Sequence, residues 1–198
     1  MRIGGPEAAR LLAQRLPQPD DFSCGAASSV VARVVRDEGY AALLLEGSAT
    51  VPGFATVGTA LDRFRSETLA MHRRIIGPVA ATGGLQMPWP SKLGTPPWAV
   101  ANQLSAGSVR YRWRPALGGL PVSAIRSAVL AGHPAAAYVG NLWSPRHVVL
   151  VVGAEDDGGL AVFDPWPGQV VTLTPSQLAQ GSLPFGRWNR AWFVVLPE

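Results

Sequence analysis

Residues 146–164 read RHVVLVVGAEDDGGLAVFD, and they carry the clearest structural signal in the chain. Two apolar runs rich in β-branched residues, 146–154 and 160–164, flank the turn-forming sequence Asp-Asp-Gly-Gly. Such a pattern is typical of a β-hairpin with a tight turn. Antiparallel pairing would bring Asp164, at the end of the second run, back beside His147, near the start of the first.

Outward from this hairpin, the pattern of apolar residues predicts helices first and a sheet afterwards. An apolar run of small residues after the polar loop at 18–23 indicates a central, buried helix that begins at Cys24, with Asp21 or Ser23 as its N-cap. This order predicts an α+β fold in one domain, residues 1–198, with an antiparallel sheet in the C-terminal half. The expected helices are 6–16, 24–37, 57–69, 98–104, 121–131 and 174–179. Besides the hairpin, the expected strands are 109–113, 135–139, 169–173 and 191–196, and the last of these is expected to close the sheet. Residues 77–97 are expected to be irregular.

Composition narrows the function classes. With 198 residues the chain can bury a core, and a single cysteine excludes an internal disulfide and a cysteine-cluster metal site. The net charge of +4 raises nucleic-acid binding as a possibility. The arginines are scattered, however, and form no basic run, so no nucleic-acid partner is expected. No cofactor or metal is expected either. Without an N-terminal signal or a membrane segment, we expect a cytoplasmic protein, or one exported without a cleavable signal.

Cys24 is either an inert buried thiol or a nucleophile. A catalytic cysteine acts as its thiolate, which the unpaired N–H groups and dipole of a helix N-terminus stabilise. A base must come from another part of the fold, and His147 stands at the start of the strongest predicted strand. Asp164 beside it could fix the imidazole tautomer and stabilise the imidazolium. His72 and His133 have no matching acid nearby and are expected to be solvated or at the surface.

Two motifs resemble one known family. Residues 18–25, QPDDFSCG, resemble the Gln-x-Asp-x-x-x-Cys-Gly signature of the C39 and C39-like peptidases, which are papain-like cysteine peptidases. Residues 147–153, HVVLVVG, and 163–166, FDPW, are similar to the histidine strand and Asp-Pro motif of the same family. The two blocks lie near the two ends of the chain, so the resemblance covers nearly its whole length.

The resemblance implies a papain-like fold and a thiol peptidase activity. By position it makes Cys24 the nucleophile, His147 the base, Asp164 the orienting acid and Gln18 the oxyanion-hole donor. The chain departs from the family at Ala26-Ala27, where a proline is usual, and at Arg146, where an apolar residue is commoner. Residues 46–120 match nothing in the family, so the substrate is expected to be a peptide or protein of unspecified sequence.

Four residues are expected to contact substrate. Gly25 would leave room for a substrate backbone next to the nucleophile. Trp98, Trp143 and Trp166 are expected to line the cleft, the last two because they lie close in sequence to His147 and Asp164. Three functions remain open: peptide or amide hydrolysis, acyl transfer by the same three residues, and a catalytically inactive papain-like scaffold that binds a partner.

Overall fold

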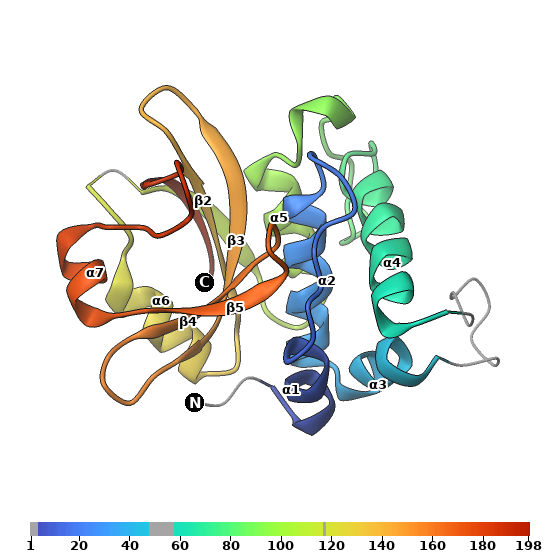
Figure 1. The fold of residues 1–198 in the computed structure, drawn as a ribbon. Coiled ribbons are helices and arrows are strands. Elements are labelled where there is room, and N and C mark those ends of the chain that lie inside the picture. Colours follow the sequence, from blue (N-terminus) through green and yellow to red (C-terminus); the bar gives the residue numbers. More distant parts are fainter. Residues whose placement is uncertain (1–3, 48–57, 117) are drawn as a thin grey trace.

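Helices form one half of the molecule and a six-stranded antiparallel sheet forms the other (Figure 1). The computed structural model describes residues 4–47, 58–116 and 118–198. The predicted α+β fold is confirmed. In chain order the elements are α1 (Pro6–Leu12), α2 (Cys24–Arg36), α3 (Glu38–Glu46), α4 (Ala60–Ile75), the 3₁₀ helix η1 (Ser91–Leu93), α5 (Pro97–Leu104), β1 (Tyr111–Pro115), α6 (Val122–Leu130), β2 (Ala135–Gly140), β3 (Pro145–Ala154), β4 (Leu160–Asp164), β5 (Gln169–Leu173), α7 (Pro175–Gln180) and β6 (Arg190–Pro197).

The strand order in the sheet is β1-β6-β2-β3-β4-β5. The last strand, β6, lies inside the sheet between β1 and β2, and the expectation that it closes the sheet is wrong. Both edges of β6 are paired, and its two faces are buried in different cores, Val195 in one and Val194 and Leu196 in the other. Residues 193–196 accordingly read FVVL, apolar on both faces. This run carries the signal for an interior strand.

The central strand β3 separates two cores. Alternate residues of a strand point to opposite faces of the sheet, and here both faces are buried. Val148 and Leu150 face the helix α2, whereas Val149 and Val151 pack in a second core with the helix α6. Figure 1 shows α2 running between the sheet and α4. This helix therefore holds the two halves together.

A buried hydrogen bond sets the position of α2 on β3. The hydroxyl of Ser28 donates to the backbone oxygen of Val148 at 3.3 Å. Ser28 lies one helical turn after Cys24 and on the same helix face, and Val148 follows His147 directly. The small residues Ala27 and Val31, both fully buried, let the helix approach the sheet closely. The contact therefore places the first turn of α2 beside the start of β3.

The helical half differs from the prediction at three places. The first helix ends at Leu12 instead of 16, and α3 was not predicted. Asp37, extended and with its side chain accepting from the N–H of Tyr40, ends α2 and caps α3. α4 begins after the capping box of Thr59 and Asp62 and continues to Ile75; residue 57, the predicted start, lies outside the described residues. The prediction ends the preceding helix at residue 37 and does not recognise Asp37 as the cap of a second helix.

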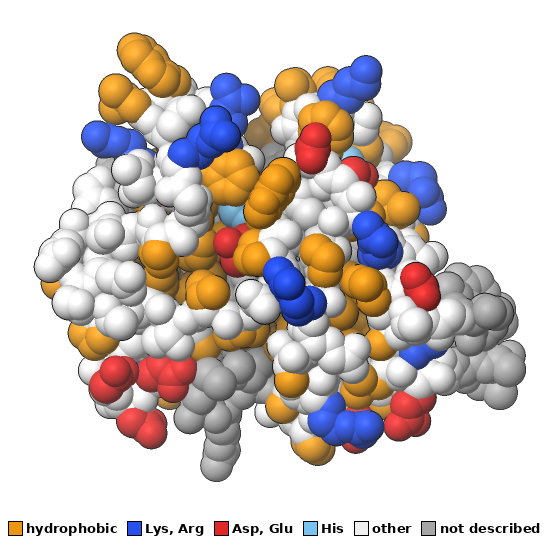
Figure 2. Space-filling model, viewed as in Figure 1, with side chains coloured by type: hydrophobic (Ala, Val, Ile, Leu, Met, Phe, Trp, Pro, Cys, Tyr) orange, Lys and Arg blue, Asp and Glu red, His pale blue; other side chains and the backbone are white. Residues whose placement is uncertain are grey.

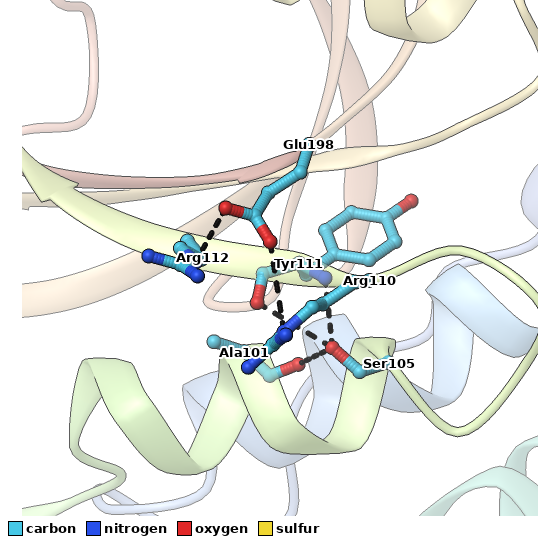
Figure 3. A network of polar contacts seen from close by, with 6 residues as sticks. All are labelled: Ala101, Ser105, Arg110, Tyr111, Arg112 and Glu198. Atoms are coloured by element: carbon cyan, nitrogen blue, oxygen red, sulfur yellow. Dashed lines mark hydrogen bonds and ion pairs between the residues drawn. The ribbon is translucent and has the colours of Figure 1, made fainter.

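The edge strand β1 is held by polar contacts at its start (Figure 3). The hydroxyl of Ser105, in the turn after α5, accepts from the N–H of Tyr111 at 2.8 Å. The carboxylate of Glu198 lies within ion-pair distance of Arg110 and Arg112. Pro115 has no N–H to offer to a further strand. These contacts hold the start of β1 against α5.

In the described part of the chain, no helix has both the length and the apolar character needed to cross a bilayer.

Candidate active site

Cys24 is the first residue of α2 and is 6% exposed. Ser23 occupies the N-cap position, but no side chain makes a capping hydrogen bond there, so neither predicted cap acts as one. The first N–H groups of the helix therefore stay available to a negative charge at or near the sulfur atom. Cys24 also lines a cavity, so this thiol is accessible from outside despite its low exposure.

His147 and Asp164 form a buried pair across the two strands of the predicted hairpin. Nε2 of His147 and Oδ1 of Asp164 are 2.7 Å apart, and the two residues are 2% and 8% exposed. The predicted pairing of these residues is confirmed. Since a carboxylate only accepts, Nε2 carries the proton and Nδ1 is left for Cys24. Oδ1 also accepts from the backbone N–H of Trp166 at 3.0 Å, which fixes the carboxylate.

The surroundings of His147 favour its charged form. Burial lowers the pKa of His147, but hydrogen bonding to Asp164 and to Cys24, together with the electrostatic influence of both groups, outweighs it and raises the pKa from 6.5 to about 9. At neutral pH the imidazole is therefore protonated. A protonated imidazole beside the thiol is the arrangement that stabilises a thiolate.

Trp188 covers the imidazole and was not foreseen. Its ring stacks on that of His147 with centroids 4.6 Å apart and an interplanar angle of 30°. Trp166 packs edge-on against Trp188 at 5.9 Å. The sequence offers no signal for this contact, because Trp188 lies in the irregular segment before β6, outside the histidine strand motif and the Asp-Pro motif. The stack keeps water away from the His147–Asp164 hydrogen bond.

The loop that carries Gln18 is anchored to the turn after Asp164. The N–H of Gln18 donates to the backbone oxygen of Pro165, and that of Leu16 donates to the oxygen of Gly168, both at 2.8 Å. Gly168 has a φ of +69°, and a Cβ there would lie 2.1 Å from the nitrogen of Pro17, so the close approach requires glycine. The loop and the hairpin thus form one unit.

The side chain of Gln18 turns toward its own loop. Its Nε2 donates to the backbone oxygen of Asp20, and its buried Oε1 has no hydrogen-bond partner among the described residues. One N–H of the amide is thus used within the loop and the second is left over. Asp20 in turn accepts from the N–H of Phe22 through Oδ1.

A cavity of about 540 Å³ opens beside Cys24 and His147. Trp98 lines it, in agreement with the sequence-based expectation, and Trp143 and Trp166 are not among its lining residues. Trp143 is 83% exposed at the turn between β2 and β3. The space next to Gly25 is filled by Thr95, whose Cβ would lie 2.7 Å from a Cβ at position 25. Gly25 therefore serves helix packing, and the expectation that it leaves room for substrate is wrong.

Most of the cavity lining comes from parts of the sequence that resemble no family. Figure 2 shows hydrophobic and cationic side chains close to a histidine on this face. Trp89 and Trp98 come from the segment before and within α5, and Trp113 and Phe193 from β1 and β6. Sequence spacing could not place them together because three of the four lie more than 65 residues from Cys24. The other lining residues include Asp21, Phe22, Lys92, Leu93, Thr95, Tyr138, Ser144 and Arg146.

The two other histidines lie away from this site. His72 is buried on α4, 7% exposed, and the expectation of a solvated side chain is wrong. The stretch of α4 that carries it is amphipathic, with the next two residues, Arg73 and Arg74, exposed. His133 is half-buried in the turn after α6. Within the described ranges, no group of three or more His, Cys, Asp or Glu side chains is arranged to hold a metal ion.

No family model matches the chain, and no curated protein sequence matches it either. Solved structures do resemble it. The peptidase domain of Streptococcus ComA, described as a bifunctional ABC transporter in quorum sensing, is 15% identical over 93% of this chain and 96% of that chain, with a TM-score of 0.47. A fragment of Prevotella intermedia prointerpain A is 11% identical over 98% and 69%, with a TM-score of 0.49. A C39-like peptidase domain of a Vibrio parahaemolyticus toxin-secretion protein is 10% identical over 60% and 81%, with a TM-score of 0.32. Two of these structures are described as peptidase domains, and one of the two is described as C39-like.

Proposed function

We propose that this protein is a cysteine peptidase in which Cys24 is the nucleophile, His147 the acid and base, and Asp164 the orienting group. One observation carries the proposal: the thiol at the start of α2 and a buried imidazole line the same cavity, and Nε2 of that imidazole is 2.7 Å from a carboxylate oxygen. All of this lies at the side of a cavity large enough for a peptide segment. A merely structural cysteine has no need of such partners.

In the proposed reaction the Cys24 thiolate attacks the carbonyl carbon of the scissile amide. The C–S bond forms, and the electron pair of the carbonyl moves to its oxygen, which the N–H of Cys24 and the free amide N–H of Gln18 stabilise. The C–N bond then breaks as His147 gives its proton to the leaving amine. Water, deprotonated by His147, cleaves the thioester and releases the acid and the thiolate. Asp164 keeps the proton on Nε2, so that Nδ1 faces the sulfur throughout.

The first test is the reactivity of the single cysteine. We expect iodoacetamide to alkylate Cys24 readily at neutral pH and His147→Gln to slow that alkylation by about tenfold or more. Because the chain has one cysteine, intact-mass measurement reports this site alone. A thiol that is unreactive in the native protein and equally slow in both variants contradicts a nucleophilic role.

The second test is cleavage of a quenched fluorescent peptide library by the wild type and by Cys24→Ala. We expect cleavage by the wild type and none by the variant. Adding an ordinary amine acceptor such as glycinamide, with mass analysis of the ratio of amide to acid product, separates hydrolysis from acyl transfer. A reactive Cys24 with no turnover of any library peptide would favour a scaffold that binds without cleaving.

A further inference from the structure

The cavity beside Cys24 has two aromatic walls. On the helical side Trp89 and Trp98 are in edge-to-face contact, with centroids 5.2 Å apart. On the sheet side Trp113 and Phe193 make the same contact at 5.6 Å. Rings held edge-to-face by their neighbours lose little further freedom when a ligand binds. The walls therefore suit a large apolar or aromatic side chain, which would gain stacking contacts with them.

Two cations line the same cavity from opposite sides. Lys92, in η1, lies on the helical side and is the only lysine of the chain, whereas Arg146 comes from β3 on the sheet side. Both are exposed, and within the described residues neither has a carboxylate within ion-pair distance. The lining residues include one acidic side chain, that of Asp21, against these two cations. The charge of the two cations and Asp21 together is therefore positive, and neither cation is in an ion pair within the described residues.

Thr95 lines the cavity beside the nucleophile. It is 5% exposed and packs against Gly25, the residue after Cys24. Its Oγ1 is buried on the side of Gly25 and has no hydrogen-bond partner among the described residues. The cavity surface next to Cys24 is therefore formed by a small side chain, and the aromatic walls and the two cations supply the features that select a ligand.

We propose that the cleft binds peptide segments in which a large apolar or aromatic side chain stands next to an acidic residue, and that Lys92 determines this preference for acid. The apolar side chain lies between the two aromatic walls, and the carboxylate lies between Lys92 and Arg146. The inference rests on the proposed function, because it makes this segment part of the substrate. It adds the chemical class of the peptide, which the three residues at Cys24 do not specify.

The test measures binding apart from catalysis. Cys24→Ala binds without turnover, and a dye-labelled, end-blocked octapeptide reports binding by fluorescence anisotropy. The peptides share a Gly-Ser background and carry Phe-Asp, Phe-Asn, Phe-Lys or Ala-Asp at the centre. We expect Phe-Asp to bind about five- to tenfold more tightly than Phe-Lys at low salt, with Phe-Asn between them and Ala-Asp weakest. The preference for Asp should fall as salt screens these exposed charges.

Charge variants assign the preference to a residue. Lys92→Gln should reduce the ratio of Phe-Asp to Phe-Lys affinity by about threefold, and Lys92→Glu should bring it to one or below. Arg65→Gln is the matched control, since Arg65 is an exposed cation on α4 that does not line this cavity. It makes the same change in net charge and should leave the ratio unchanged. An equal effect of both variants would mean a response to net charge alone and would overturn the inference.

Failure of this inference and failure of the proposed function give different results. Equal affinity for all four peptides, together with cleavage of library peptides by the wild type, overturns the substrate class and leaves the peptidase intact. The expected preference in Cys24→Ala, together with an unreactive Cys24 in the wild type, supports the binding class and removes the peptidase. Both can be read from the same protein preparations.

Discussion

Replacing Asp164 with asparagine separates the charge of this carboxylate from its geometry. Oδ1 of Asp164 accepts from the N–H of Trp166 as well as from His147, so an asparagine is held with its amide oxygen in the same place. The hydrogen bond to Nε2 and the tautomer of His147 are therefore kept, and only the negative charge is lost. Asp164→Ala, in contrast, removes both.

The size of the effect follows from the kind of hydrogen bond that is replaced. A hydrogen bond to a charged group contributes about 1.5–3 kcal/mol, and one between neutral groups about 0.5–1.5 kcal/mol. The difference of about 1 to 1.5 kcal/mol corresponds to about one pKa unit. We therefore expect the pKa of His147 to fall from about 9 to about 8 or lower in Asp164→Asn, since burial continues to lower it. Asp164→Ala leaves a buried N–H unpaired and should reduce activity by about a hundredfold or more.

The assay is the pH dependence of kcat/KM on a library peptide that the wild type cleaves. We expect the alkaline limb of the wild type near pH 9, because loss of the His147 proton removes the acid that protonates the leaving amine. In Asp164→Asn this limb should move to lower pH by about one unit, with a loss of about tenfold or less at the optimum. An alkaline limb that stays in place in Asp164→Asn refutes the reasoning, because the carboxylate charge would then not support the imidazolium.

Further predictions concern the parts that hold the site in place. Gly168→Ala should lower the free energy of unfolding by at least about 2 kcal/mol in urea titrations, because its Cβ would overlap the backbone of Pro17; Gly181→Ala, also at positive φ but in open space, should cost only about 1 kcal/mol, and equal losses would contradict the account. Trp188→Ala should reduce kcat/KM by about tenfold, because water would reach the His147–Asp164 hydrogen bond. The control Trp143→Ala should change kcat/KM by less than about twofold, because Trp143 is exposed, and an equally large loss in both variants would contradict the role given to Trp188. The protonated His147 should stabilise the fold fully below about pH 6.5, and this contribution should disappear as pH rises through about 9, because its pKa is raised in the folded state; the difference in unfolding free energy between wild type and His147→Gln should therefore shrink over that range, and a constant difference would count against the raised pKa.

The hairpin at β3 and β4 could be predicted because its signals are local. Two apolar runs and a Gly-Gly turn determine the pairing, and the second strand was expected at 160–164, where β4 lies. The start of α2 at Cys24 was equally local, since a polar loop precedes a long apolar helix. Gln18 was found by resemblance, but only the structure gives the contact between its loop and the turn after Asp164.

The walls of the cleft could not be predicted in the same way. Trp143 and Trp166 are near His147 and Asp164 in sequence, but the aromatic walls of the cavity come from Trp89, α5, β1 and β6. Trp113 reaches the cleft because β6 is inserted between β1 and β2, which is a non-local pairing. Sequence distance is a poor guide to position when strands that lie far apart in the chain pair with each other.

By itself the sequence determined the α+β class, the start of the central helix at Cys24 and the return of Asp164 to His147, because each depends on turn chemistry and apolar spacing within about twenty residues. The tertiary fold alone brings the thiol and the imidazole to one cavity, stacks Trp188 on the imidazole, and adds Lys92 and Thr95 to the lining of that cavity. These contacts depend on how α2 packs on β3 and on the order of strands in the sheet. That packing is the sum of many weak, non-local contacts, and no short stretch of sequence records it.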